Sequence, residues 1–137
     1  MAATISVDII TPERVVYSGD IEMAIVPALD GFLGILPGHA PLITGLKIGI
    51  IKVKKDGDEL SISTSGGIME VQPEKIKLVV NTAELPEEID VERAKSAKER
   101  AEERLTAGSK KIDETRAKAA LQRAISRLQA AGHHEEN

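Results

Sequence analysis

The prolines and glycines of this 137-residue chain are confined almost entirely to its first part. All six prolines and nine of the eleven glycines lie at or before Pro86, and only Gly108 and Gly132 follow it. Turn residues at short intervals are typical of closely spaced strands, whereas long stretches without them are typical of helices. The sequence therefore predicts a β domain over residues 1–85 and a helical domain over residues 86–137.

Alternating and apolar segments predict the first strands of the β domain. In Thr4–Ile10 apolar and polar side chains alternate, which is the period of a strand with one buried face. Val15–Tyr17 and Ile21–Val26 are apolar and largely β-branched, as strands tend to be. Because Ser18-Gly19-Asp20 lies between them, we expect a turn at these three residues.

Two further turn signals separate the remaining strands. The Asp56-Gly57 pair between Ile48–Lys54 and Glu59–Thr64 is a strong hairpin signal. Pro73-Glu74 indicates another turn, and the strands on either side of it are expected at Ile68–Val71 and Ile76–Asn81. Short strands at this spacing, with no helix between them, predict a β-sandwich or flattened barrel.

The second half has the signals of two helices. Asp90 is a suitable N-cap for a helix from Val91 to about Ala107, and Gly108 is well placed to end it. A second helix is expected from about Ile112 to Ala131, closed by Gly132. Because the connection is short, the helices should be antiparallel. The predicted fold class is α+β: an N-terminal β-sandwich or flattened barrel followed by a C-terminal antiparallel two-helix hairpin.

The apolar stripe of the first helix is narrow and made mostly of alanine. Alanine lets helices approach closely, but it buries little area, and burial contributes only about 25 cal/mol per Å². The sequence therefore predicts a weakly held hairpin that is able to undock or extend. The stripe consists of Val91, Ala94, Ala97, Ala101 and Leu105.

The overall composition excludes several classes of protein. The net charge of −4 and the aromatic share of 1% argue against a nucleic-acid-binding protein. The absence of cysteine excludes disulfides and thiolate sites. The apolar stretches are far shorter than the roughly 20 residues that span a bilayer, and no signal peptide is recognisable. We expect a protein without direct membrane insertion, which reaches a membrane only through a partner.

The arginines of the second half follow a repeated spacing. On each predicted helix three arginines stand at offsets 0, 7 and 11, which places them on one narrow stripe. Two solvated charged faces would give the same pattern. Arginine also suits bidentate binding of phosphate or carboxylate, so the stripes could form a polyanion site or meet an acidic protein surface. The residues are Arg93, Arg100, Arg104, Arg116, Arg123 and Arg127.

Candidate catalytic residues are sparse. His39 lies in a predicted loop between two prolines with no evident triad partner. Ser65-Gly66-Gly67 lacks the lysine and spacing of a P-loop and is better interpreted as a tight turn or bulge. His133 and His134 could bind a metal weakly, but a polar tail is the favoured interpretation. We expect no catalytic residues and no resident metal.

Several sequence blocks, in order, identify a family. The chain resembles the epsilon subunit of bacterial F-type ATP synthases over essentially its whole length, and the charged helical hairpin fits the same resemblance. The matching blocks are Ile9–Glu13, Val16–Asp20, Gly34–Leu42 and Ser65–Val71.

The resemblance implies a non-catalytic subunit of a rotary enzyme. In that family the β-sandwich binds the gamma subunit and the rotor ring of the membrane sector. The helical pair changes between a folded hairpin and an extended form that reaches the catalytic alpha/beta head and restrains ATP hydrolysis. The implied location is the cytoplasmic face of the cell membrane, where the protein is peripheral.

The resemblance also implies regulatory binding of ATP, with or without magnesium, and no catalytic cofactor. The family pattern Ile/Leu-Asp-x-x-Arg-Ala stands intact at residues 89–94. An acidic residue before it would hold the base side of the nucleotide, and arginines would reach the phosphates. The implied residues are Glu84, Ile89, Asp90, Arg93, Ala94, Arg100, Arg123 and Arg127, with Arg116 as a further candidate.

Two residues of the β half are candidate partner contacts. Phe32, within the predicted Asp30–Gly34 loop, stands where many family members have an acidic residue. The resemblance places this loop and His39 at the end that faces the rotor ring. An apolar contact through Phe32 could replace a polar one there, and burial of Phe32 beneath the loop is the alternative.

Two other functions remain open on the sequence. A free-standing nucleotide or polyanion sensor would share the arginine stripes but would not need the matching blocks of the β half. An enzyme is less supported, since no catalytic constellation is present.

Overall fold

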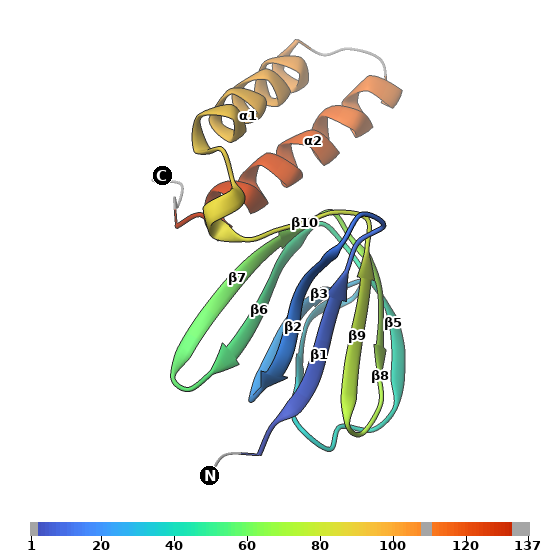
Figure 1. Ribbon diagram of the computed structural model, residues 1–137. Coiled ribbons are helices and arrows are strands. Elements are labelled where there is room, and N and C mark those ends of the chain that lie inside the picture. Colours follow the sequence, from blue (N-terminus) through green and yellow to red (C-terminus); the bar gives the residue numbers. More distant parts are fainter. Residues whose placement is uncertain (1–2, 108–110, 133–137) are drawn as a thin grey trace.

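The computed structural model describes residues 3–107 and 111–132, with only the backbone described at Lys111 and Ile112. Ten strands come first, then one turn of 3-10 helix, η1 (Pro86–Glu88), and two α-helices (Figure 1). The strands are β1 (Ile5–Ile10), β2 (Val15–Ile21), β3 (Met23–Ala28), β4 (Gly31–Ile35), β5 (Leu42–Leu46), β6 (Gly49–Lys55), β7 (Asp58–Thr64), β8 (Gly67–Val71), β9 (Lys75–Val80) and β10 (Ala83–Glu84).

The strands form two packed layers that are joined at one edge. One layer has the order β10-β7-β6-β3-β4, and the other has the order β5-β8-β9-β1-β2. They meet where Ala28 of β3 pairs with Leu46 of β5. Among the described strands the pairings are antiparallel, apart from β1 with β9. This arrangement confirms the predicted β-sandwich or flattened barrel.

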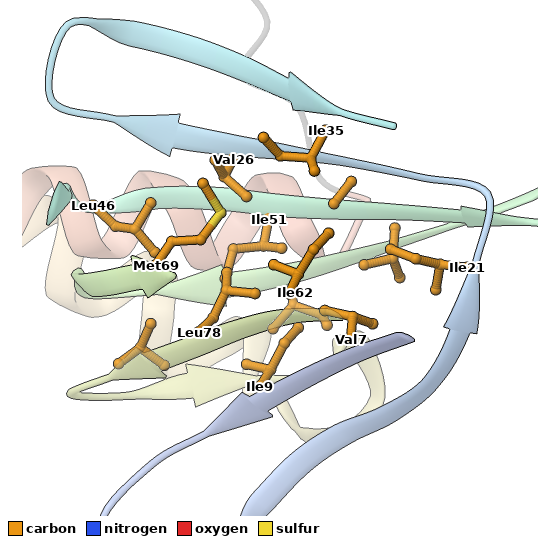
Figure 2. Packing of buried hydrophobic residues seen from close by; sticks show 14 of the residues in the cluster. Val7, Ile9, Ile21, Val26, Ile35, Leu46, Ile51, Ile62, Met69 and Leu78 are labelled. Carbon is orange, nitrogen blue, oxygen red and sulfur yellow. The ribbon is translucent and has the colours of Figure 1, made fainter. Parts of the chain in front are cut away.

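The core lies between the two layers and is aliphatic. Strand alternation sends every second side chain inward, so Val7 and Ile9 of β1 are fully buried. They meet residues of the other layer such as Ile51 and Ile62 (Figure 2). The residues of this core cluster come from the β half, between Ile5 and Leu85.

Two local expectations in the β half are wrong. Ser18-Gly19-Asp20 is not a turn but lies inside β2, because Ile5 pairs with Ile21 and continuous pairing with β1 extends through the polar residues. The chain bends at Glu22 instead. Asp30–Gly34 is not a loop either, since most of it belongs to β4, which pairs with β3. Strong tertiary pairing overrides the turn preference of glycine and aspartate here.

Ser65 and Gly66 form a close-packed connection between β7 and β8, and Gly67 is the first residue of β8. Gly66 has φ +107, which is unfavourable for other residues. A Cβ atom there would lie 2.8 Å from the carbonyl oxygen of Leu46. The glycine is therefore required by the approach of the two backbones.

The helical predictions are confirmed where the structure describes them. α1 (Val91–Thr106) starts after Asp90, whose Oδ1 accepts a hydrogen bond from the backbone N–H of Arg93 at 3.0 Å. α2 (Lys111–Ala130) is followed by Gly132 with φ +89. The predicted roles of Gly108, His133 and His134 lie outside the described residues.

The hairpin sits at one end of the sandwich with α2 nearer to it (Figure 1). α2 packs on β7 and β6 as well as on α1. The buried residues of α1 are Ala94 and Ala101, and the buried apolar residues of α2 are Ala117, Ala124, Leu128 and Ala130. The alanines permit close approach, as predicted, but each of them buries little apolar area.

Candidate nucleotide-binding and partner-binding sites

The antiparallel hairpin brings the start of α1 and the end of α2 to the β domain. There Nε of Arg127 donates a hydrogen bond to Oε1 of Glu84 at 2.6 Å. Both side chains are partly exposed, at 40% and 28%. This ion pair joins the end of α2 to β10, and both of its members are in the predicted ATP site.

The predicted Ile89–Ala94 motif runs from the end of η1 into the first turn of α1. Ile89 and Ala94 are buried, so they fix the turn by packing. Asp90 caps the helix through the backbone of Arg93, and the Arg93 side chain is exposed. The motif therefore presents a cation at a helix start while its apolar members face inward.

The structure does not gather all the predicted arginines at this end. Arg100 and Arg123 are exposed, one on each helix. Arg116 stands eleven residues before Arg127, which is about 16 Å along the helix axis at 1.5 Å per residue. Arg116 therefore lies at the far end of α2, away from Glu84.

A second ion pair, between Arg14 and Glu88, escaped the sequence interpretation. Nη2 of Arg14 lies 2.7 Å from Oε1 and 2.6 Å from Oε2 of Glu88. Oε1 also accepts from the backbone N–H of Leu85 at 2.9 Å. Hydrogen bonding to Arg14, and then to Leu85, lowers the pKa of Glu88, while the Glu88 hydrogen bond raises the pKa of Arg14. The pair connects η1 to the segment between β1 and β2. The one feature of the sequence that pointed to it is that Arg14 is the lone arginine of the β half.

A buried hydroxyl pair that sequence reasoning also missed fixes α2 on the sheet. Oγ of Ser126 donates to the carbonyl oxygen of Gly49 on β6 at 2.6 Å. Oγ of Ser63 on β7 lies 3.0 Å from Oγ of Ser126. Because the hydroxyl hydrogen of Ser126 is used in the bond to Gly49, the Ser63 hydroxyl is the donor to Ser126. Both serines are buried. Serine on an otherwise apolar helix face was the available signal.

The two predicted partner contacts of the β half are separate. Phe32 is the second residue of β4, paired with Pro27, and is 78% exposed, so it is not buried under a loop. His39 lies in the connection between β4 and β5, beyond the other end of β4. Its Nδ1 lies 2.7 Å from the carbonyl oxygen of Ala40. The two residues do not share one loop.

An apolar row crosses the outer face of the second layer. Val15 pairs with Ile10, Ile10 with Val79, and Val79 with Ile68, so neighbouring strands each contribute one side chain. Val15, Ile68 and Val79 are 57%, 58% and 48% exposed. We call Val15, Ile10, Val79 and Ile68 the apolar row. A continuous exposed row of this kind is typical of a protein interface.

Two further features bear on ligands and membranes. Within residues 3–107 and 111–132, no group of three or more His, Asp or Glu side chains is placed to hold a metal ion. No helix in the same residues is long and apolar enough to cross a bilayer.

Comparisons with known proteins decide the family. Residues 4–86 match the model of the β-sandwich domain of the ATP synthase delta/epsilon chain, and residues 87–132 match that of its long α-helix domain. The ATP synthase epsilon chain of Brevibacillus brevis is 54% identical over 74% of this chain and 77% of the relative. This chain belongs to the ATP synthase epsilon family. Membership confirms the predicted resemblance and the expectation of a non-catalytic subunit.

Other epsilon chains and solved structures agree. The epsilon chain of Desulforamulus reducens is 50% identical over 78% of this chain and 81% of its own length, and that of Bacillus subtilis 49% over 77% and 80%. A chain in the mitochondrial ATP synthase of Euglena gracilis has a TM-score of 0.82 at 23% identity, covering 97% of this chain and 84% of that one. At such identity the likeness supports the epsilon fold alone.

Proposed function

We propose that this epsilon-family chain is a central-stalk subunit of an F-type ATP synthase that couples rotation and restrains ATP hydrolysis. Its β-sandwich would be fixed to the rotor and its hairpin would be movable. It would lie at the cytoplasmic face of the cell membrane, held there by the complex. The observation that carries the proposal is that the core of the β half is separate from the helix pair, in which α1 is buried only through alanines.

The apolar row supports docking on the gamma subunit. Its side chains form one surface across four strands, and association would remove them from water. Phe32 and His39 remain the candidate contacts with the rotor ring, at two places on the β half rather than one.

The small interface between α1 and α2 supports a role of the hairpin in inhibiting ATP hydrolysis. α1 is buried only through alanines within its own length, and its stripe of arginines is exposed. In an extended form the same arginines would be free to meet acidic residues of the catalytic alpha/beta head. Two such states can differ by only a few kcal/mol, so a ligand of the folded form would shift their populations.

Regulatory ATP binding is proposed at the base of the hairpin. Arg93, Arg100, Arg123 and Arg127 supply cations for the phosphates of ATP, with or without magnesium, and Glu84 would face the base. Since Glu84 and Arg127 pair with each other, their separation would accompany nucleotide binding. Arg116 is too far along α2 to join the same phosphates.

The ATP site is tested by calorimetric titration of the whole chain with ATP. Asp90→Ser combined with Arg93→Ala should abolish binding, because it removes the charge but keeps an N-cap residue for α1. Lys118→Ala on the exposed face of α2 is the control and should bind as the parent does. Unchanged affinity in the double variant would remove the ATP assignment.

The motor partner is tested by co-purification from cells. A stalk subunit should bring down gamma and catalytic subunits, and Ile68→Glu with Val79→Glu should abolish this because it places charges in the apolar row. Glu59→Lys, on the other layer, is the control. A free-standing nucleotide sensor would bind ATP but would bring down no motor subunit.

A further inference from the structure

A groove of about 510 Å³ lies where α2 leaves the outer face of the first layer uncovered. α2 packs on β7 and β6, but the neighbouring face of β3 and β4 continues beyond it. The apolar walls are formed by residues from both the β domain and α2. They are Ile25, Pro27, Phe32, Ile48, Ile50 and Ile125.

The walls of this groove are apolar surface that the folded chain leaves partly exposed. Ile25, Ile50 and Ile125 are each only half-buried, and Phe32 is 78% exposed. Phe32 is the only phenylalanine of the chain. Covering this surface would remove apolar area from water and would therefore be favourable. The volume lies within the usual range of small-ligand sites.

The polar rim of the groove is cationic. Lys47 is exposed at the rim, and Lys52 lines the wall with its Nζ 3.7 Å from Oε1 of Glu59. No acidic side chain is among the lining residues, all of which belong to the described part of the chain. The Ser126 hydroxyl, which also lines the groove, is already bonded to Gly49 and Ser63. The charge at the rim therefore favours an anion.

We propose that this groove binds a single-chain amphiphile with an anionic head group, with the chemistry of a medium-chain or long-chain fatty acid. The tail would lie along the isoleucines and Phe32, and the head group would meet Lys47 and Lys52. This site is distinct from the base of the hairpin. On a helical wheel of α2, Arg127 points roughly 150° away from the groove-lining residues.

Occupancy of the groove has a consequence for the hairpin. Ile125 belongs to α2, whereas Ile25 and Ile50 belong to the β domain. A ligand that contacts both parts binds the docked form better than the undocked form, so it stabilises docking by mass action. The inference does not depend on the motor function or on ATP.

The test is titration of the full chain with dodecanoate below its micelle concentration, measured by calorimetry. Dodecanoate should bind, and both Phe32→Ala and Lys47→Glu should weaken it about tenfold or more. Both positions are exposed, so the fold should be retained. Lys55→Glu, at the far end of β6, is the matched control and should bind normally. Bound dodecanoate should also slow proteolysis of the hairpin.

Several results would overturn the proposal. Binding of the cationic dodecyltrimethylammonium with the same affinity as dodecanoate would show that the groove does not discriminate by head-group charge. Full affinity in Lys47→Glu or Phe32→Ala would place the ligand elsewhere. Binding only to anionic vesicles, and not to monomeric dodecanoate, would indicate a membrane surface instead. Unchanged hairpin proteolysis would overturn the link to docking. The same variants are also titrated with ATP. Because the groove and the nucleotide site are separate, a failure of ATP binding would leave the dodecanoate result unaffected.

Discussion

At the scale of single residues, a hydrogen bond and an ion pair of Asp8 connect separate segments of the chain. Oγ of Ser18 donates to Oδ1 of Asp8 at 2.6 Å, and Nζ of Lys75 lies 2.9 Å from Oδ2. Asp8 therefore joins β1 to β2 on one side and to the start of β9 on the other. The Ser18 hydrogen bond, followed by that of Lys75, lowers the pKa of Asp8 from its ordinary value of 3.8.

This carboxylate should make the β domain less stable in acid. Because the folded pKa is lowered, its contribution is present above 3.8 and is lost as the pH falls through the folded pKa. Asp8→Asn should remove that part of the pH dependence, measured by urea unfolding across the range below about pH 5. Asp58→Asn, at the exposed start of β7, is the control. An unchanged acid dependence in Asp8→Asn would contradict the assignment.

At the scale of elements, α2 is fixed to the sheet more firmly than α1. Ser126 donates to the carbonyl oxygen of Gly49 and meets Ser63, and next to it Arg127 pairs with Glu84. α1 instead contributes buried alanines to the helix–helix seam. The polar contacts of α2 need fixed geometry, so they define one docked position of the hairpin.

Loss of the Ser126 hydroxyl should loosen the docking of α2. Ser126→Ala removes the donor to the partly buried carbonyl of Gly49 and the partner of the buried Ser63 hydroxyl, so it should destabilise the docked form by about 1 to 3 kcal/mol. Hydrogen exchange should then quicken in α2 but not in β1. Ser96→Ala on the exposed face of α1 is the control. Equal protection of α2 in both variants would rule out this role.

A larger side chain in the alanine seam should separate the helices. Ala101 is 1% exposed, so Ala101→Leu has no room and should destabilise the hairpin by about 1 to 3 kcal/mol. Protease cleavage within α1 should become faster, while the β domain keeps its unfolding midpoint. Ala107→Leu, at an exposed position, provides the comparison. Cleavage at the parental rate would show that the seam is loosely packed.

At the scale of the whole molecule, the two halves do not share a core. The buried core cluster runs from Ile5 to Ala83, with Leu85 packed against it, and no described helical residue belongs to it. The hairpin lies at one end of the sandwich, where α2 packs on β7 and β6 (Figure 1). The β half therefore has the means to stay folded while the hairpin changes position.

A fragment that ends at Asp90 should fold by itself. It keeps the whole core cluster and the Arg14–Glu88 pair. Its amide NMR spectrum should show the dispersion of a folded β protein. Ile62→Ala, in the centre of the core, should lower the stability of this fragment by about 2 to 5 kcal/mol. An unfolded fragment would show that the hairpin is required for the β fold.

The sequence by itself determined the features with a local cause. Alternation predicted β1, Asp56-Gly57 predicted the β6–β7 hairpin, and Asp90 predicted the start of α1. Each depends on residues within a few positions of one another, so period and turn chemistry are sufficient. The family blocks were readable for the same reason, since they are local patterns.

Only the tertiary structure decided which distant segments of the chain contact one another. Arg14 and Glu88 are 74 residues apart in the sequence. Phe32 became part of a groove because β4 pairs with β3 next to the face that α2 covers. Arg127 was predicted as a phosphate ligand, but its partner Glu84 came from the sheet edge. Strand order and helix docking set these contacts, and neither is encoded in the period of a single segment.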